Sequence, residues 1–428
     1  MKKGRVMAML DRDMAMARRV AAAVAEAGGR TYYVGGCVRD RLLGRENKDI
    51  DIEVHGVSVQ ALEAILNSLG ELTTMGASFG IMGLRHYGLD IAMPRSEKAT
   101  GRGHKDFEVF VDPFIGEERA ARRRDFTMNA LMQDVLTGEI LDFFGGRADI
   151  AAGRIRHVSD ATYAEDPLRV FRAAQFAARF GFTVADETTA ISAGMAVEAL
   201  ASERVMGELE KALLKSARPS IFFRELEKMK QLRPWFAEAA ALLQADWRRV
   251  MAGLDAAAAL RPESSRPVDF MLAATCVGFD PPTAKRFLAR LTNVVEATRY
   301  VLNLVERHGE MGGFLAADPG ETGWMAFFDR TDCPEDLILL ERAIRGDGTP
   351  GWPGIEDRLR NWLALYRRRM SEPYVMGRDL VEAGIRPGPD MGRALAHAHG
   401  LRLAGVDKAE QLRQTLAWIE GEGNTAHA

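Results

Sequence analysis

Two short stretches, Thr31-Tyr-Tyr-Val-Gly-Gly-Cys-Val-Arg-Asp40 and Asp49-Ile-Asp-Ile-Glu-Val54, decide the fold of the N-terminal part of the chain. The first four residues are β-branched and aromatic, which predicts a short buried strand. The Gly-Gly pair lets the backbone approach an anion, and the helix expected after it would present its N-terminus to phosphate. The second stretch alternates apolar and acidic residues. It therefore predicts a strand with the carboxylates of Asp49 and Asp51 on one face.

Strand, glycine turn, helix and acidic strand in this order indicate nucleotidyl transfer from a Mg²⁺-bound triphosphate, because a divalent cation could bridge Asp49 and Asp51. Each piece alone has a simpler explanation. A Gly-Gly pair is commonly a plain turn, an Asp-x-Asp is commonly a solvated strand edge, and Arg39 with Asp40 could form a surface ion pair. Their combination within one short segment favours the catalytic interpretation.

Length and composition are those of a globular protein with several domains. The chain has 428 residues, 47% of them hydrophobic and 27% charged, which suffices for two to four domains. No run reaches the roughly 18 apolar residues of a membrane span, and no signal peptide is predicted. Three dispersed cysteines argue against a disulfide framework and a zinc site. We expect a cytoplasmic protein without membrane association or an obligate protein partner.

A net charge of −3 does not by itself indicate a nucleic-acid binder, so RNA binding would need a local basic groove. Strand-like and helical segments mix over residues 1–150, which predicts an α/β domain. Beyond it, segments at helical spacing dominate and no strands are expected, with linkers at 261–267 and 346–354. The expected strands cover 31–35, 50–54, 80–84, 89–92, 107–111 and 140–144, and the expected helices cover 14–27, 59–69, 126–133, 168–179, 204–214, 219–230 and 284–306.

Asp90 is a third acid, inside the apolar strand expected at 89–92. A carboxylate buried there without a partner is costly, so a metal or an arginine should lie nearby. The alternative is a strand edge at which Asp90 faces water. The polar, glycine-containing stretch 95–112 that follows predicts a loop.

Arg122-Arg-Arg-Asp-Phe-Thr-Met-Asn-Ala130 is the second motif. Arginine suits phosphate because its planar fork donates bidentate hydrogen bonds and keeps its charge. On the expected helix, Asp125 and Asn129 share a face and would orient the site. A purely structural role for Asp125 as a helix cap is the alternative.

Glu165-Asp-Pro-Leu-Arg-Val-Phe-Arg172 is the third motif. Proline is favoured in the first turn of a helix, so Asp166 is expected at the cap, with Arg169 and Arg172 on one face. An aspartate beside an arginine can form complementary hydrogen bonds to a base edge, because the acid accepts from an exocyclic amine while the arginine donates. Cytosine and adenine both carry such an amine.

Together these motifs resemble the signature of the tRNA nucleotidyltransferase and bacterial poly(A) polymerase family, whose members extend RNA 3′ ends without a nucleic-acid template. The resemblance implies Mg²⁺ held by Asp49 and Asp51, with Asp90 completing the catalytic acids. It also implies that the loop at 95–112 helps to change nucleotide. One departure is Gln175, where many members have arginine. The nucleotide-binding residues that the resemblance implies are Gly36, Arg39, Arg124, Asp166, Arg169 and Arg172.

Further blocks separate the branches of this family. Residues 74–81 resemble the tRNA-directed branch, since the poly(A) polymerases carry an arginine-rich segment there. The glycines and prolines over 377–392 resemble the helical tail of bacterial tRNA nucleotidyltransferases, and residues 203–210 resemble a block that buttresses the preceding helix. Residues 270–276 contain no His-Asp pair, so the phosphohydrolase domain of some relatives is not expected.

We therefore expect an α/β N-terminal nucleotidyltransferase head, a mixed sheet with helices, followed by an all-α neck, body and tail. The expected boundaries are 1–150 for the catalytic head, 151–262 for a neck that selects the nucleotide, 263–370 for the body and 371–428 for an RNA-binding tail. The resemblance implies addition of C and A to the 3′ end of tRNA from CTP and ATP, with release of pyrophosphate. Addition of only C-C or only A, a poly(A) polymerase, and a non-catalytic RNA-binding protein are the alternatives.

Overall fold

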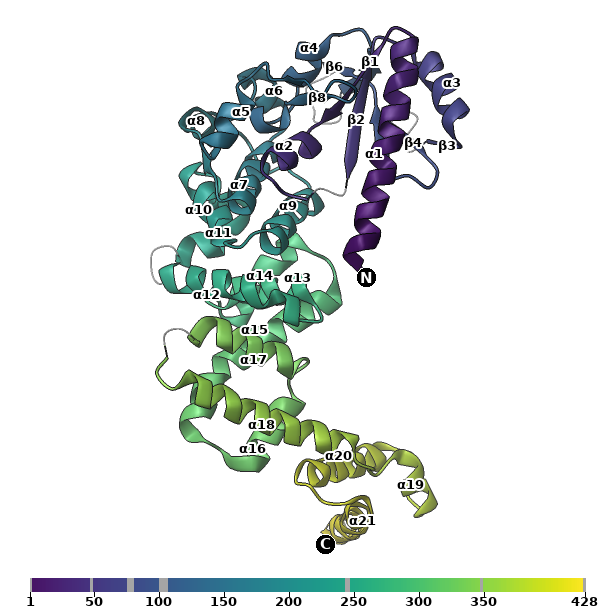
Figure 1. Ribbon diagram of the computed structural model, residues 1–428. Helices are drawn as coiled ribbons and strands as arrows, with labels where there is room; N and C mark the ends of the chain where they lie inside the picture. Colours follow the sequence, from purple (N-terminus) through teal and green to yellow (C-terminus); the bar gives the residue numbers. More distant parts are fainter. Residues whose placement is uncertain are drawn as a thin grey trace. The chain divides into compact units, whose positions relative to one another are not determined.

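The computed structural model describes residues 2–46, 49–74, 81–99, 107–242, 247–346 and 349–425 (Figure 1). The chain divides into two compact units, Met1–Ala212 with Ile221–Ala237 and Leu213–Ser220 with Glu238–Ala428. In the part described, no helix is long and apolar enough to cross a membrane. Most of the block at 74–81 lies outside the described residues, as does the glycine-containing stretch 100–105.

A seven-stranded mixed sheet, in the order β3-β4-β5-β2-β1-β8-β9, forms the base of the first unit. β2 and β5 run parallel, and the other neighbouring strands are antiparallel. The expected α/β head with a mixed sheet is thus confirmed. The strands are β1 (Arg30–Val34), β2 (Ile50–His55), β3 (Leu72–Thr74), β4 (Ile81–Leu84), β5 (Leu89–Ala92), β8 (Met132–Asp134) and β9 (Ile140–Leu141).

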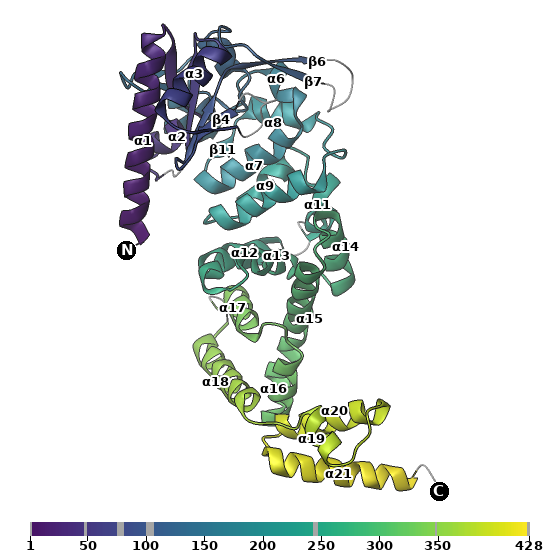
Figure 2. The same ribbon diagram turned by 90° about the vertical axis from the view of Figure 1, so that its right-hand side faces the viewer.

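Two helices, α1 (Lys2–Glu26) and α3 (Val59–Leu69), pack on the same face of the sheet (Figures 1 and 2). Successive side chains of a strand point to opposite faces. The apolar residues of β2, which are Ile50, Ile52 and Val54, are therefore buried in the core under these helices. The polar residues of β2 between and after them lie on the opposite face, where the candidate site forms.

Two segments of the head depart from the predicted elements. The helix expected at 126–133 is wrong: the chain forms the 3-10 turn η2 (Thr127–Asn129) and then β8. Met132 pairs with Val34 of β1, so sheet pairing prevails over the helical pattern. The stretch 95–112, expected as a loop, begins with the strand β6 (Arg95–Ala99), which pairs as an antiparallel hairpin with β7 (Phe107–Val111) (Figure 2). The strand expected at 107–111 is thus confirmed, and the loop prediction is wrong at its start.

Helices make up most of the chain beyond the sheet, as predicted. The exception is a short parallel pair, β10 (Arg154–Ile155) with β11 (Thr183–Val184). Strands of two residues are too short to show an alternating pattern in the sequence. The helices that lie wholly or partly in the first unit after the first glycine turn, α3 apart, are α2 (Gly36–Leu42), α4 (Glu117–Arg122), α5 (Gly146–Ala151), α6 (Asp160–Glu165), α7 (Leu168–Phe180), α8 (Asp186–Ala193), α9 (Ser202–Lys215), α10 (Ser220–Lys228) and α11 (Arg233–Leu242).

The described part of the second unit contains helices and no strand. The single helix expected at 284–306 is two, because Thr292 is extended and its hydroxyl accepts a hydrogen bond from the Val294 amide at 3.1 Å. The linker expected at 261–267 is an ordered connection in which Ser264 donates to Asp336 at 2.8 Å. The elements are α12 (Trp247–Leu260), η3 (Arg261–Glu263), α13 (Pro267–Cys276), α14 (Pro281–Leu291), α15 (Val295–Ala317), α16 (Gly320–Asp329), α17 (Pro334–Arg345), α18 (Trp352–Ser371), α19 (Gly377–Glu382), α20 (Pro389–Leu403) and α21 (Lys408–Thr425).

The C-terminal glycine and proline block forms a helix–turn–helix, as its spacing predicts. α19 ends two residues before Gly384, which adopts a φ of 93°, and α20 starts at Pro389. Leu380, Ala394 and Ala398 are buried together in a small core between these helices.

Candidate active site

A cavity of about 360 Å³ opens over the polar face of β2 in the first unit. Its acids come from β2 and β5. Its arginines come from the start of β6, from the residues after α4 and from α7. The cavity therefore gathers both signs of charge from segments far apart in the sequence. The charged residues of its lining are Asp51, Glu53, Asp90, Arg95, Arg123, Arg124 and Arg169.

Asp51 and Asp90 are neighbours across the parallel strands β2 and β5, whose register sets one beside the other. Burial raises the pKa of Asp51 and the like charge of Asp90 raises it further, while Arg124 acts in the opposite direction. Two carboxylates in this arrangement repel each other and attract a divalent cation. The structure thus places Asp90 beside Asp51, with an exposed side chain and not a buried one, and its catalytic role stays a prediction.

Asp49 lies one residue before β2 with an exposed side chain, outside the lining of the cavity. Its charge nevertheless contributes to the raised pKa of Asp51. Among the described residues, no group of three or more His, Cys, Asp or Glu side chains is arranged to hold a metal by itself. Mg²⁺ is usually held by one or two carboxylates together with substrate phosphates, so the pair of Asp51 and Asp90 fits such an ion.

Arg124 lies at the cavity between a glycine and a buried acid. Its Nη2 donates to Oε2 of Glu53 at 3.1 Å, and Glu53 is 2% exposed. Burial alone would raise the pKa of Glu53, but Arg124 and the hydrogen bond from His55 hold it at about 2. A Cβ on Gly35, which has a φ of 64°, would lie 3.1 Å from Nη1 of Arg124. The glycine turn therefore leaves room for Arg124, and Gly36 begins α2 directly after it.

Arg39 lies in the interior and not in the lining of the cavity. It is 4% exposed, and its Nη2 pairs with Asp40 at 2.7 Å while its Nη1 donates to Asn129 at 2.5 Å. Its guanidinium also lies over the rings of Phe176 and Phe180. Burial lowers the pKa of Arg39, an effect that Asp40 opposes. In this structure Arg39 connects α2 to the second motif and does not line the cavity that contains Asp51 and Asp90.

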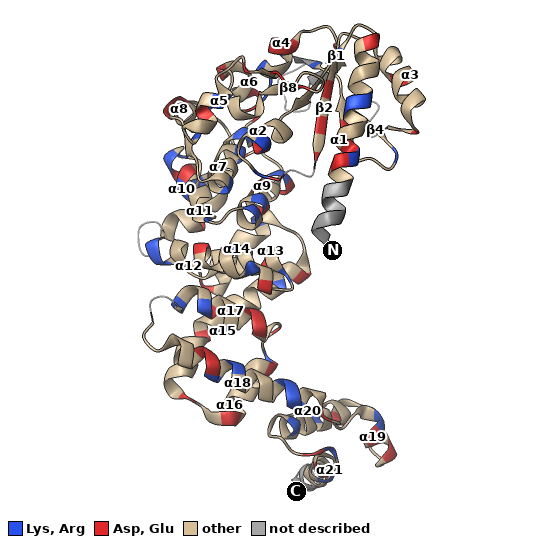
Figure 3. Cartoon of the chain, viewed as in Figure 1, with Lys and Arg blue, Asp and Glu red and all other residues tan. Residues whose placement is uncertain are grey.

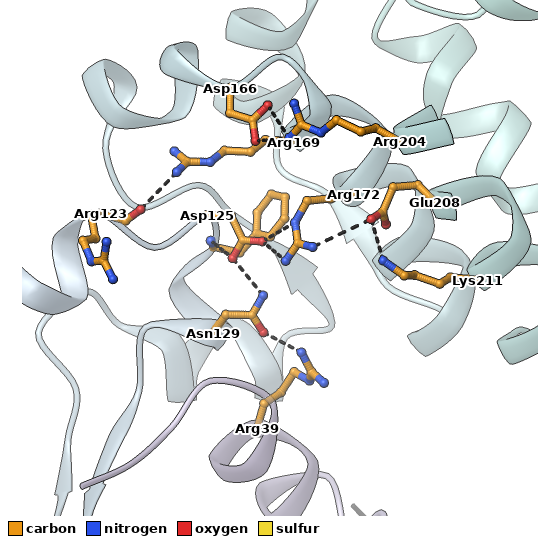
Figure 4. A network of polar contacts seen from close by, with 11 residues as sticks. Arg39, Arg123, Asp125, Asn129, Asp166, Arg169, Arg172, Arg204, Glu208 and Lys211 are labelled. Carbon is orange, nitrogen blue, oxygen red and sulfur yellow. Dashed lines mark hydrogen bonds and ion pairs between the residues drawn. The ribbon is translucent and has the colours of Figure 1, made fainter. Parts of the chain in front are cut away.

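Asp125 joins the second motif to α7 through a network of polar contacts (Figure 4). It accepts hydrogen bonds from Asn129 Nδ2 at 2.9 Å and from Arg172 Nε at 2.8 Å. Burial opposes ionisation, yet Arg172 and Asn129 hold the pKa of Asp125 below its usual range. Asp125 and Asn129 thus interact as predicted, across a turn and not along a helix. Arg172 also lies 3.8 Å from Glu208, so α9 braces α7 as its motif predicts.

Asp166 precedes α7 as predicted, and its carboxylate accepts a hydrogen bond from the Leu168 amide at 3.1 Å. It also pairs with Arg204 of α9 at 2.9 Å. Arg169 donates from Nη2 to the Arg123 carbonyl at 3.1 Å (Figure 4). It also donates from Nη1 to the Thr162 carbonyl. The two side chains expected to read the base therefore come from one helical start, and of the two only Arg169 lines the cavity.

Three charged residues of the lining are not among those predicted from the sequence: Glu53, Arg95 and Arg123. Glu53 carried a readable signal, since it follows Asp51 by two residues and must share its face of the strand. The acidic positions of β2 are red in Figure 3. Arg95 follows the strand of Asp90, but a sequence read as a loop gives no direction to its side chain.

Residues 31–156 match the Poly A polymerase head domain family. This match covers the mixed sheet, Asp51 and Asp90, and three of the cavity's arginines, Arg95, Arg123 and Arg124, whereas Arg169 lies beyond it. The fold and the site thus define the class of the protein as a nucleotidyltransferase.

Full-length relatives narrow that class. The Multifunctional CCA protein of Pseudomonas putida is 35% identical over 380 residues, which covers 85% of this chain and 95% of the relative. The CCA-adding enzyme of another strain of Pseudomonas putida is 34% identical over 380 residues with the same coverage. A solved structure described as a CCA-adding enzyme in apo form II shares the fold, with a TM-score of 0.73, 21% identity and coverage of 97% of this chain and 98% of that one. The chain belongs to the CCA-adding enzyme family of tRNA nucleotidyltransferases, which confirms the resemblance read from its motifs.

Proposed function

We propose that this chain adds C and A nucleotides to the 3′ end of tRNA, with CTP and ATP as donors. The observation that carries the proposal is the cavity in which Asp51 and Asp90 lie beside Arg124 and Arg169. Transfer from a nucleoside triphosphate depends on positioning and on charge stabilisation, and it therefore needs cation-holding acids and phosphate-holding arginines in one place.

The acidic side of the cavity is the proposed Mg²⁺ site. Nucleotidyltransferases of this family generally use a divalent metal. Asp51 and Asp90 would hold Mg²⁺ together with the phosphates of the nucleotide, and Asp49 is the further acid that the family resemblance implies. When bound, the ion lowers the pKa of the attacking hydroxyl and neutralises charge on the leaving group. The raised pKa of Asp51 supports this assignment, because a cation would relieve the repulsion between the carboxylates.

The reaction joins the terminal O3′ of tRNA to the α-phosphorus of the bound triphosphate, while the bond from that phosphorus to the bridging oxygen breaks and pyrophosphate leaves. In this proposal Arg124 steadies the triphosphate, with Gly36 in the turn beside it. Arg39 and Arg172 act indirectly, without contacting the triphosphate, since both guanidinium groups are committed to the network around Asp125 and Asn129. That placement supports a positioning role for them in nucleotide binding.

Asp166 and Arg169 are the proposed base-selecting pair. An aspartate accepts from the exocyclic amine of cytosine or adenine, and an arginine donates to a ring nitrogen or carbonyl. The guanidinium of Arg169 is held by two backbone carbonyls, so its direction is set before the nucleotide arrives. Uracil and guanine present other patterns at that edge and would be disfavoured.

The remaining assignments follow the division expected from the sequence. We propose a catalytic head at 1–150, a selecting neck at 151–262, a body at 263–370 and an RNA-binding tail at 371–428, in a cytoplasmic enzyme. tRNA would be held mainly through its backbone and shape, as proteins commonly recognise folded RNA.

Replacing one acid tests the proposed chemistry. Asp51→Asn should lower the rate of CMP addition to tRNA by about a thousandfold or more, because it removes charge that holds the cation in the transition state. Asp13→Asn is the matched control: Asp13 is a buried acid that accepts a hydrogen bond from the Gly88 amide at 3.2 Å, away from the cavity. Wild-type rates in Asp51→Asn would remove the metal assignment.

A further inference from the structure

Glu53 is a buried acid beside the proposed catalytic residues to which the reaction above gives no role. It lies two residues after Asp51 on the same face of β2, and it lines the cavity while being only 2% exposed. Burying a carboxylate is unfavourable unless partners compensate for its lost hydration. The contacts of its two oxygens therefore indicate what Glu53 is for.

Each oxygen of Glu53 has a different partner. Oε2 accepts from Nη2 of Arg124 at 3.1 Å, and Oε1 lies 2.9 Å from Nε2 of His55. His55 is itself buried and packs edge-on against Tyr32, with ring centroids 5.4 Å apart. The Tyr32 hydroxyl donates to Glu117 at 2.9 Å. On the side away from Arg124, Glu53 is thus held in place by packed side chains of β1, β2 and α4.

On its other side Arg124 lies against the backbone of the glycine turn. Its Nη1 approaches Gly35 so closely that a Cβ there would lie 3.1 Å away. Glu53 and Gly35 together leave few positions open to this guanidinium, whose side chain is 21% exposed. An arginine held in this way meets a phosphate without first losing side-chain freedom, which favours binding.

We propose that Glu53 is a positioning residue for Arg124, and that His55 supports Glu53 from behind. The proposal rests on the proposed function, in which Arg124 steadies the triphosphate. Glu53 itself does not read the base. Because CTP and ATP share the triphosphate, Glu53 affects both nucleotides equally, whereas the selecting pair at α7 affects CTP and ATP relative to UTP and GTP.

The first test compares KM for CTP, on tRNA that lacks its terminal CCA, with KM for ATP, on tRNA that ends in C-C. Glu53→Gln should raise both KM values by about tenfold, with kcat changed by less than about threefold, because a charged hydrogen bond that orients the binding arginine is lost. The ratio of the two KM values should stay as in the wild type. Glu238→Gln is the matched control, since Glu238 pairs with Arg290 in the second unit, and it should leave both KM values unchanged.

A double-mutant cycle separates positioning from a general loss of structure. Once Arg124→Met has removed the group that Glu53 orients, adding Glu53→Gln should leave both KM values within about twofold of those of Arg124→Met. Additive effects of the two changes would overturn the positioning role. If Glu53→Gln does not fold, Glu53→Asp decides, because it keeps the charge but shortens the reach and should still raise both KM values.

The outcomes distinguish the two levels of the proposal. Unchanged KM values in an active, folded Glu53 variant would overturn the positioning role alone. A wild-type protein that adds neither nucleotide to tRNA would overturn the proposed function, and this role with it.

Discussion

Arg39 and Arg124 come from neighbouring motifs and carry the same charge, yet their surroundings give them different roles. Arg39 is buried over two phenylalanine rings and donates to Asn129, whereas Arg124 reaches the cavity beside Asp51 and Asp90. A guanidinium whose donors are committed inside the protein fixes structure, and one that is partly open to the cavity keeps donors available for a ligand. At the scale of residues, burial and hydrogen-bond partners therefore distinguish the buried Arg39 from Arg124, which lines the cavity.

Asp125 offers a test of the buried network at the same scale. Asp125→Asn should lower the free energy of unfolding by about 3 kcal/mol near neutral pH, because it deprives the Arg172 guanidinium of its nearest charged partner. Since the folded state holds the pKa of Asp125 below its ordinary value, the stability due to its charge is present above that ordinary value and is lost as pH falls through the lower one.

Urea unfolding of wild type and Asp125→Asn between pH 7 and pH 3 checks this sign. The gap between the two proteins should stay constant down to about pH 4 and then narrow, as expected when the wild-type carboxylate takes up its proton. A gap that is small at pH 7, or that widens in acid, would show that the charge of Asp125 does not stabilise the fold.

At the scale of elements, β2 and the start of α7 each position a different group of side chains of the site. β2 brings Asp51 and Glu53 to one face by strand alternation, and α7 brings Asp166 and Arg169 together at its first turn. In the proposed function, the first element supplies groups for transfer and the second supplies groups for base choice. Changes in the two elements should therefore have different kinetic effects.

Asp166→Ala tests that division. The preference for CTP over UTP on tRNA lacking its CCA end should fall by about tenfold or more, since one base-reading hydrogen bond is lost, while the rate with CTP falls less. Relative kcat/KM values measure it. Asp160→Ala, which removes an exposed aspartate of α6, is the control. An unchanged preference in Asp166→Ala would exclude its selecting role.

Local pattern was sufficient to predict β2, because alternation of Ile50, Ile52 and Val54 with acids has only one reading. It failed at 126–133, where the helical pattern is overridden when Met132 pairs with Val34, a contact distant in sequence. The same limit applies to the site. Asp51, Asp90 and Arg124 were predictable from motifs. The burial of Arg39, by contrast, depends on Phe176 and Phe180, which only the folded chain brings to it.

At the scale of the whole molecule, net charge said little about a polyanionic partner. The chain carries −3 overall, while its cavity gathers four arginines around three acids, which are Arg95, Arg123, Arg124 and Arg169 around Asp51, Glu53 and Asp90. Local arrangement and not total charge therefore prepares this protein for a nucleotide. One assay of nucleotide addition to tRNA tests the proposed activity of the whole chain.

That assay offers each nucleotide alone to tRNA transcripts that end before the first C, after C-C and after C-C-A. The account predicts that CTP extends the first transcript by two residues, that ATP extends the second by one, and that neither extends the third. Addition of C alone or of A alone would restrict the activity to part of the CCA end. Unlimited addition of A, or no addition to any transcript, would contradict the account.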